Sequence, residues 1–184
     1  MLVIDTSAFV SLAVGGMFEP TTEEFEIATT RTVCDELERT GAYDDRHGTA
    51  AASVVAQRDA LTILSTDPEA FTTSRIDRGE ASCVVAAREL DATFLVTDDY
   101  RALPELQELV TADVVLSPIV IRALSKRNAI SDEAAQAAFD SIVADRDWLG
   151  APIYRYAKSY FMIDVLLERA HFHCQRRILT PSSA

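Results

Sequence analysis

The sequence contains few lysines, few cysteines and no long apolar run. The last two shortages each argue against a class of protein. Only two of its 17 basic residues are lysines. The three cysteines, Cys34, Cys83 and Cys174, are widely spaced and form no CxxC pair. We therefore expect small buried side chains there, not a disulfide framework or a zinc site. No apolar stretch reaches the roughly 18 residues that suggest a membrane-spanning helix.

The start of the chain also lacks a secretion signal. No basic segment precedes an apolar run with a small-residue cleavage site, and the chain opens directly into Leu2-Val3-Ile4-Asp5. We therefore expect an intact cytoplasmic protein with no membrane partner. The 184 residues are 48% hydrophobic and 25% charged, which is typical of a single globular domain or one domain with an added helix.

The charge is strongly negative and unevenly distributed. The formal net charge is −12, and an acidic surface with almost no lysine resembles the halophilic proteins of salt-loving cells, although an ordinary acidic bacterial protein fits too. Such a surface repels nucleic acid at low salt, yet metal ions and local arginines can still carry a contact. Residues 1–147 hold 12 cations and 27 anions, whereas residues 148–184 hold 5 cations and 2 anions. The C-terminal end is thus a basic patch on an acidic body.

Short apolar runs alternate with segments of helical periodicity along the chain. The expected strands are residues 2–4, 26–29, 61–64, 93–96 and 114–116. The expected helices are residues 7–14, 32–39, 47–59, 78–90, 100–109, 118–126, 132–145 and 152–174. Residues 19–26, around Pro20, are expected to be an acidic loop or the approach to a short strand, and residues 67–74 are expected to be a loop. The alternation predicts an α/β protein with a mostly parallel sheet of four or five strands, covered on both faces.

Several carboxylates fall where such a sheet binds its ligands. Asp5 directly follows the first strand, and Asp98 and Asp99 follow the strand at residues 93–96. Glu36 and Glu80 lie in the helices at residues 32–39 and 78–90. All can point to the carboxyl end of the sheet, where open α/β sheets bind ligands. Clustered carboxylates need a cation to stay ionised, and Mg²⁺ or Mn²⁺ would relieve the repulsion and support phosphodiester hydrolysis.

Each of these acids also has a purely structural explanation. Asp77 and Glu80 fit a capping box at the start of a helix. Asp5 and Asp98 could each cap the helix that follows, and Glu36 could be a solvated helix residue. The capping roles do not explain why four acids converge on one end of the sheet.

Three neighbouring residues are candidates for supporting roles. Asp99 could cap the next helix or assist Asp98. Ser7 could hydrogen-bond a metal-bound water or support the first helical turn. Thr6 is the expected cap of that helix.

At this point the chain resembles the PIN-domain family. The resemblance rests on the opening Leu2-Val3-Ile4-Asp5-Thr6-Ser7-Ala8-Phe9 and on Glu36-Leu37, Gly79-Glu80-Ala81 and Thr97-Asp98-Asp99, in the expected order and spacing. It covers residues 2–147 and implies a three-layer α/β/α sandwich with a metal-dependent ribonuclease site. We therefore divide the chain into a PIN-like nuclease domain, residues 1–147, and a C-terminal helical extension, residues 148–184, packed on the same domain.

The resemblance also implies roles for individual residues. Asp5, Glu36, Glu80 and Asp98 would be the catalytic acids, with Asp5, Glu80 and Asp98 as ligands of Mg²⁺ or Mn²⁺, and Thr6, Ser7 and Asp99 would support them. VapC-type toxins, the most numerous members, cleave RNA and are held inactive by an antitoxin. The implied function is an endoribonuclease toxin that binds RNA and an antitoxin and forms a homodimer.

The sequence departs from the family pattern at two places. Residues 15–30 lack the usual clean pattern, and residues 148–184 extend past a minimal toxin, as a partner helix, an RNA-binding element or a dimer arm. One apolar face of that extension is expected to pack on the body. Its cations would meet RNA phosphates or pair with the acidic surface; they are Arg155, Lys158, Arg169, Arg176 and Arg177. His171-Phe172-His173-Cys174 matches no familiar zinc spacing.

Other functions fit the residues less well. A haloacid-dehalogenase-type phosphatase needs an acid where Ser7 stands, and a response-regulator receiver needs a lysine after the last strand. Neither a P-loop nor a dinucleotide-binding glycine pattern is present. Nucleophilic catalysis by Ser or Cys lacks a convincing histidine partner. The remaining alternatives are an RNA-processing nuclease without an antitoxin and a catalytically inactive scaffold that binds RNA or protein.

Overall fold

The structure, a computed structural model, describes residues 1–161 of the chain. In that range, nine α-helices and two short 3-10 helices (Arg58–Ala60 and Glu69–Phe71) accompany five strands. The strands are β1 (Leu2–Ile4), β2 (Ile27–Thr30), β3 (Thr62–Leu64), β4 (Phe94–Val96) and β5 (Asp113–Val115). The α-helices are α1 (Thr6–Val14), α2 (Phe18–Glu24), α3 (Arg31–Thr40), α4 (Arg46–Ala56), α5 (Arg78–Glu89), α6 (Leu103–Leu109), α7 (Ser117–Lys126), α8 (Asp132–Asp145) and α9 (Pro152–Phe161).

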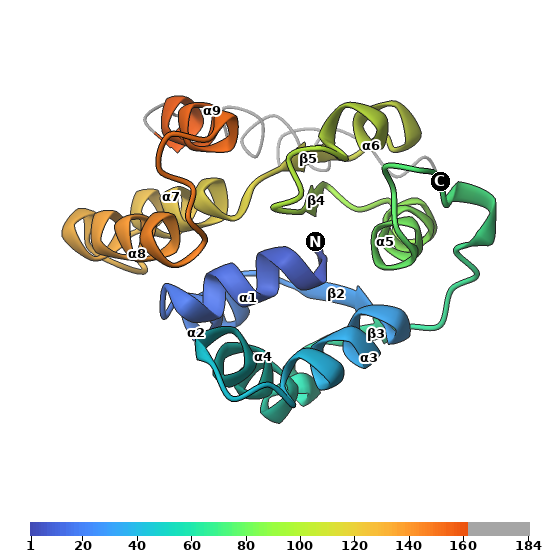
Figure 1. Ribbon diagram of the computed structural model, residues 1–184, viewed down its shortest axis with the longest axis horizontal. Coiled ribbons are helices and arrows are strands. Elements are labelled where there is room, and N and C mark those ends of the chain that lie inside the picture. The colour runs from blue at the N-terminus through green and yellow to red at the C-terminus, as the bar shows by residue number, and fades with distance from the viewer. Residues whose placement is uncertain (162–184) are drawn as a thin grey trace, which may run out of the picture.

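All five strands run parallel in one sheet, in the order β3-β2-β1-β4-β5. Helices cover both faces, with α5 on one side and α1 and α7 on the other (Figure 1). The predicted α/β sandwich with a parallel sheet of four or five strands is therefore confirmed. Burial on both faces explains why the central strands are apolar throughout: Val3 and Ile4 of β1 are completely buried.

The segment around Pro20 differs from the prediction. It was expected to be an acidic loop, but Phe18–Glu24 forms helix α2. Pro20 lies in the first turn, where its missing N–H would have had no partner within the helix. The Phe18 ring packs edge-on against Phe9 of α1, with ring centroids 5.8 Å apart. This tertiary contact fixes a helix that the acidic, proline-containing sequence did not indicate.

Smaller differences lie at the ends of other elements. The helix predicted from Tyr100 begins at Leu103, with Pro104 in its first turn as expected. The predicted loop at residues 67–74 contains the 3-10 turn Glu69–Phe71. The last strand begins one residue earlier than predicted and ends at Val115.

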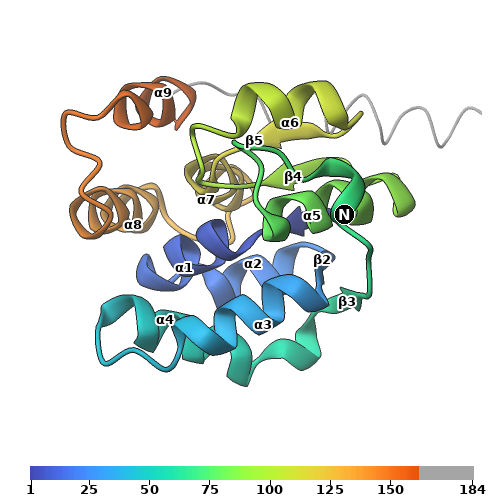
Figure 2. The same cartoon turned by 45° about the vertical axis from the view of Figure 1, so that its right-hand side comes forward.

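Helix α9 packs on the body of the domain. Ile153 and Ala157 are buried, and the Tyr156 ring contacts the Tyr100 ring edge-on at 5.5 Å. Helix α9 contacts α7, and the turned view shows it above α8 (Figure 2). The predicted continuation of this helix to residue 174 lies outside the described residues.

Two further expectations concern cysteines and the membrane. Cys34 and Cys83 are free and buried, as predicted, whereas Cys174 lies outside the described residues. Among residues 1–161, the helices are all too short or too polar to cross a membrane.

Candidate active site at the carboxyl end of the sheet

The register of β1 and β4 places the first two candidate residues side by side. Ile4 pairs with Val96, so Asp5 and Thr97 both follow directly at the carboxyl end of the sheet. The Thr97 hydroxyl donates to Asp5 Oδ2 at 2.6 Å. A contact between residues 92 positions apart thus follows from the pairing of two three-residue strands.

Asp5 is almost fully buried and surrounded by donors. Its Oδ1 accepts from the Ala8 N–H at 2.8 Å, which makes Asp5, and not Thr6 as predicted, the N-cap of α1. The Ser7 hydroxyl lies 2.9 Å and 3.1 Å from the two Asp5 oxygens. Burial raises the pKa of Asp5 to about 7, although the hydrogen bonds from Thr97 and Ala8 oppose the rise and the nearby Asp98 adds to it.

Glu36 is held between α1 and α5. The Thr6 hydroxyl donates to Glu36 Oε2 at 2.5 Å. A Cβ added to Gly79 would lie 2.5 Å from Glu36 Oε2 and 2.7 Å from Oε1, so only glycine lets the carboxylate approach α5 this closely. Burial raises the pKa of Glu36, while the Thr6 hydrogen bond and the nearby Arg39 lower it.

Glu80 lies in the capping box at the start of α5. The capping box with Asp77 is confirmed: Asp77 Oδ1 accepts from the Glu80 N–H, and Glu80 Oε2 accepts from the Asp77 N–H, both at 2.9 Å. Glu80 also lines the cavity described below. Burial raises its pKa to about 8; the Asp77 N–H opposes that rise, and the charges of Asp77, Asp5 and Asp99 add to it. Glu80 therefore lies within the electric field of these other acids.

The two aspartates after β4 point to different places. Asp98 is buried, and its carboxylate accepts from the Ser117 N–H at 2.9 Å and from the Ser117 hydroxyl at 2.7 Å. It therefore stabilises the start of α7, not the helix directly after it. Asp99 lines the cavity, and its Oδ1 accepts from the Arg101 and Ala102 N–H groups in the turn before α6.

One cavity of about 510 Å³ collects most of the predicted site residues. The predicted residues among its lining are Asp5, Thr6, Ser7, Glu36, Glu80 and Asp99. Asp98 is the exception, since its carboxylate faces Ser117. Its backbone N–H donates to the hydroxyl of Ser7, a lining residue of the cavity, at 2.8 Å. The catalytic roles of Asp5, Glu36, Glu80 and Asp98 and the supporting roles of Thr6, Ser7 and Asp99 stay predictions.

The same cavity is also lined by residues that the sequence analysis did not predict as site residues. They are Val10, Arg39, Thr40, Tyr43, His47, Asp77, Gly79 and Arg146. The capping box had named Asp77, and Gly79 preceded Glu80 in a quoted motif. No local pattern marked Arg39, His47 or Arg146, because three separate helices bring them together.

The predicted RNA-binding cations of the C-terminal extension are only partly described. Arg155 and Lys158 are exposed on α9, and Lys158 Nζ lies 5.5 Å from the centre of the Tyr154 ring. Arg169, Arg176 and Arg177 lie outside the described residues, as do His171 and His173.

The donor set of the cavity suits a hard divalent cation. All its acidic donors are carboxylate oxygens, which Mg²⁺ and Mn²⁺ prefer, and a cation would offset the burial that raises the pKa values of Asp5 and Glu80. Within residues 1–161, however, no three Asp, Glu, His or Cys side chains are already arranged as a metal-binding group. Thr6 and the Asp77 N–H donate to Glu36 and Glu80, so an ion would compete with these donors.

Comparison with known proteins assigns the family. The DUF3368 family model, described as a PIN domain, matches residues 1–160. The match covers most of the chain and continues past residue 147, where the sequence analysis placed the end of the nuclease domain; that boundary stays a prediction. Neither the comparison with curated proteins nor that with solved structures gave a match.

Proposed function

The chain belongs to the PIN-domain family, and from that premise we propose that it is an endoribonuclease that hydrolyses RNA phosphodiester bonds with Mg²⁺ or Mn²⁺. PIN domains are generally nucleases and usually bind divalent metals. The observation that carries the proposal is the convergence of Asp5, Glu36, Glu80 and Asp99 on one cavity from separate parts of the chain. Burial raises the pKa values of Asp5, Glu36 and Glu80, and such perturbed carboxylates are common at functional sites.

The residues of the cavity have distinct parts in this proposal. Asp5, Glu80 and Asp98 or Asp99 would hold the metal, which would neutralise charge on the phosphate and polarise a water. Thr97 and Ser7 keep the Asp5 carboxylate in place through hydrogen bonds. Asp98 connects this end of the sheet to α7 through Ser117.

The resemblance to VapC-type toxins extends the proposal to a biological role. We propose that the protein is the toxin of a toxin–antitoxin pair, works in the cytoplasm as a homodimer and is inhibited by an antitoxin protein. The acidic composition further suggests that it works in concentrated salt. These points rest on resemblance and composition, and the nuclease proposal does not depend on them.

Cleavage of RNA by the purified protein tests the proposed activity. Mixed cellular RNA is incubated with the full chain in potassium chloride with Mn²⁺, with Mg²⁺ and with chelator. Asp5→Asn serves as the inactive variant, and Asp59→Asn, an exposed aspartate in a 3-10 helix, serves as the matched control. We expect metal-dependent cleavage by the wild type and by Asp59→Asn, but none by Asp5→Asn.

The outcomes separate the alternatives. Cleavage by Asp5→Asn at the wild-type rate would show that the activity comes from another site or a contaminant. RNA binding without cleavage in either metal would favour the inactive scaffold. Cleavage that no co-encoded protein inhibits would favour an RNA-processing nuclease without an antitoxin.

A further inference from the structure

The acidic cavity also has basic lining residues that the metal proposal does not use. Arg39 of α3, His47 of α4 and Arg146, directly after α8, line it together with the carboxylates. We call these three residues the basic lining. A chain with a net charge of −12 repels a polyanion over most of its surface, so cations beside the acidic groups would attract an anionic substrate to this site.

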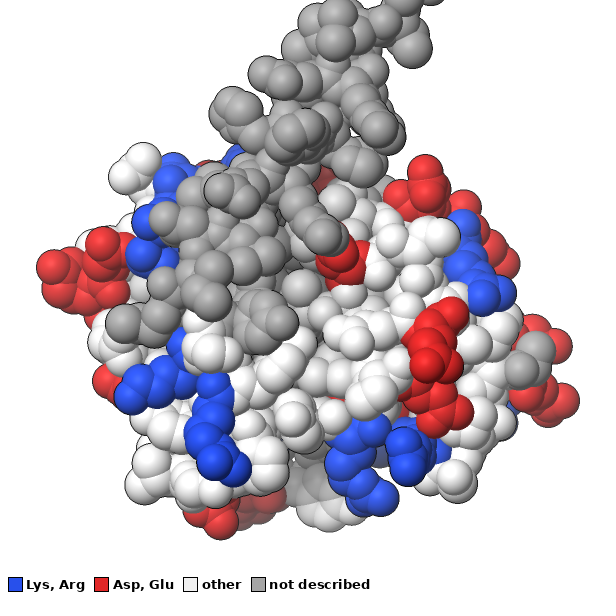
Figure 3. Space-filling model, turned by 90° about the horizontal axis from the view of Figure 1, so that it is seen from above, with Lys and Arg blue, Asp and Glu red and all other residues white. Residues whose placement is uncertain are grey.

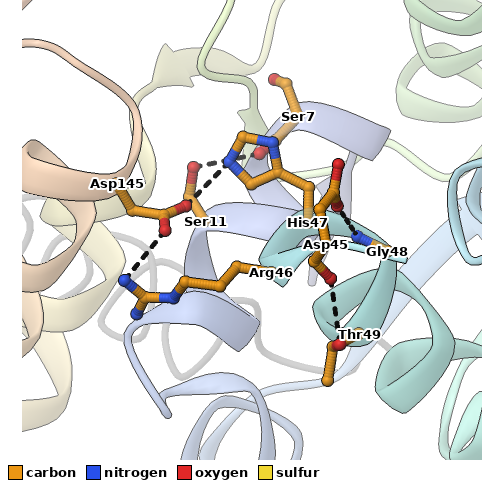
Figure 4. Close-up of polar contacts among 8 residues, drawn as sticks. All are labelled: Ser7, Ser11, Asp45, Arg46, His47, Gly48, Thr49 and Asp145. Carbon is orange, nitrogen blue, oxygen red and sulfur yellow. Dashed lines mark hydrogen bonds and ion pairs between the residues drawn. The ribbon is translucent and has the colours of Figure 1, made fainter. Parts of the chain in front are cut away.

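His47 lies beside a buried acid. Asp145 Oδ2 lies 2.7 Å from His47 Nε2, and Asp145 Oδ1 lies 3.0 Å from Arg46 Nη1 (Figure 4). The Asp145 side chain is only 6% exposed, whereas the His47 side chain is 39% exposed. These contacts join the start of α4 to the end of α8, beside the cavity and next to Arg146.

The two arginines of the basic lining are available to a ligand. Among the described residues, no carboxylate lies within ion-pairing distance of Arg39 or Arg146. The Arg39 Nε–H donates to the Asp35 carbonyl at 3.1 Å, which leaves the ends of its guanidinium for another acceptor. Arg39 and Arg146 also lower the pKa values of Glu36 and Asp98, respectively, against the dominant effect of burial, so both lie in the field of the acidic site. Guanidinium groups bind phosphate oxygens well because they present paired donors.

An aromatic side chain stands at the edge of the same cavity. Tyr43 lines it and is 69% exposed, which is unusual for a large aromatic side chain. Its loop packs tightly on α4: a Cβ added to Gly48 would lie 1.9 Å from the Tyr43 carbonyl oxygen. Gly48 therefore allows the backbone contact that holds Tyr43 at this edge. An exposed, positioned ring is a stacking surface for an unpaired base.

The described residues on the face seen from above do not form a second basic site of this kind. On that face, Lys and Arg form small separate groups, interspersed with Asp and Glu, around a largely uncharged area (Figure 3). A nucleic acid backbone needs several neighbouring cations, and the described residues visible there do not form a continuous basic track. The cavity, in contrast, combines cations, a ring and the acidic residues.

From these observations we propose that Arg39, His47 and Arg146 bind backbone phosphates of single-stranded RNA in the cavity and that Tyr43 stacks on one of its bases. The inference rests on the proposed function, because it places the RNA over the acidic residues. It commits to single-stranded RNA, since a base that is paired in a duplex cannot lie flat on Tyr43. It also moves the principal RNA contact away from Arg155 and Lys158 of α9.

The test measures binding separately from cleavage. Fluorescence anisotropy of an end-labelled single-stranded RNA is recorded with the full chain in the Asp5→Asn background, in Mg²⁺, over a series of salt concentrations. Arg39→Ala and Arg146→Ala should each weaken binding about tenfold and lower the salt slope by about 0.7. Arg58→Ala removes an exposed arginine that pairs with Glu38, and as the matched control it should bind normally.

Variants of the other residues make the test more specific. Tyr43→Ala should weaken binding at least about fivefold, whereas Tyr43→Phe should retain it, because stacking needs only the ring. His47→Ala should weaken binding less than either arginine variant. Thermal melting of each variant identifies any loss of fold.

Each outcome supports or overturns the inference. Normal binding by folded Arg39→Ala and Arg146→Ala overturns it, and so does the absence of measurable binding by the parent. Loss of binding in Arg155→Ala and Lys158→Ala alone would assign the RNA to α9 instead. If RNA binding depends on the basic lining but the wild type cleaves no RNA, this inference stands and the proposed nuclease activity fails.

Discussion

The substitution Gly79→Ala should slow RNA cleavage strongly while changing the free energy of unfolding very little. The added Cβ would lie 2.5 Å from Glu36 Oε2, whereas ordinary van der Waals contact begins at 3.4 Å. The carboxylate must therefore move by about 0.9 Å, which is possible because it is the far end of a flexible side chain. The move disturbs the hydrogen bond from Thr6, which holds Glu36 in the cavity.

The expected effects on stability and on cleavage differ greatly in size. Alanine in a helix is favoured over glycine by about 0.5–1 kcal/mol, and the disturbed hydrogen bond costs a similar amount. The free energy of unfolding should thus change by less than about 1 kcal/mol. A misplacement of about 1 Å at a reacting centre can cost about a hundredfold in rate. We therefore expect a folded protein with about a hundredfold slower RNA cleavage.

The assay pairs chemical denaturation with the initial rate of RNA cleavage in Mn²⁺. Gly15→Ala is the matched control, because the nearest atoms to its added Cβ would be Cδ1 of the flexible Ile142 side chain, at 3.2 Å, and two atoms of Ala138, at 3.4 Å. Wild-type cleavage by folded Gly79→Ala would refute the claim that the position of Glu36 matters. A stability loss of several kcal/mol would refute the claim that only a flexible side chain has to move.

Three further predictions concern protons, neighbouring acids and salt. Without metal, the free energy of unfolding should fall as pH rises through the pKa values of about 7 for Asp5 and about 8 for Glu80. The reason is that the folded protein retains protons that the unfolded chain loses near pH 4. Melting curves should show this fall, and Mn²⁺ should reduce it. Asp99→Asn should weaken Mn²⁺ binding with little change in melting temperature, whereas Asp98→Asn should lower the melting temperature because it disturbs the contact with Ser117. If the two variants change Mn²⁺ binding and melting temperature equally, the different orientations of Asp98 and Asp99 are contradicted. Potassium chloride should raise the melting temperature by screening a net charge of −12, and a lower melting temperature in salt would argue against a repulsive surface.

The sheet and the positions of its acids could be predicted because both follow from local sequence. Short apolar runs identified the strands; Asp5 follows β1 directly, and Asp98 and Asp99 follow β4 after Thr97. Once the strands are parallel, their carboxyl ends must meet, so the location of the site required no knowledge of packing.

Other features depend on contacts between distant segments and could not be predicted in this way. Helix α2 is stabilised by the packing of Phe18 on Phe9, which no local pattern around Pro20 indicates. The different orientations of the two aspartates after β4 depend on where α7 begins. The basic lining comes from α3, α4 and α8, and its assembly requires the packing of helices that are far apart in the chain.

The central claim is that a divalent ion joins the carboxylates at the carboxyl end of the sheet. A crystal structure of the protein soaked in Mn²⁺, with anomalous scattering recorded to locate the ion, tests this most directly. The account predicts an anomalous peak in the cavity, bound by Asp5 and by at least one of Glu80, Asp98 and Asp99. Full occupancy elsewhere, or a cavity with no peak at millimolar Mn²⁺, would contradict it.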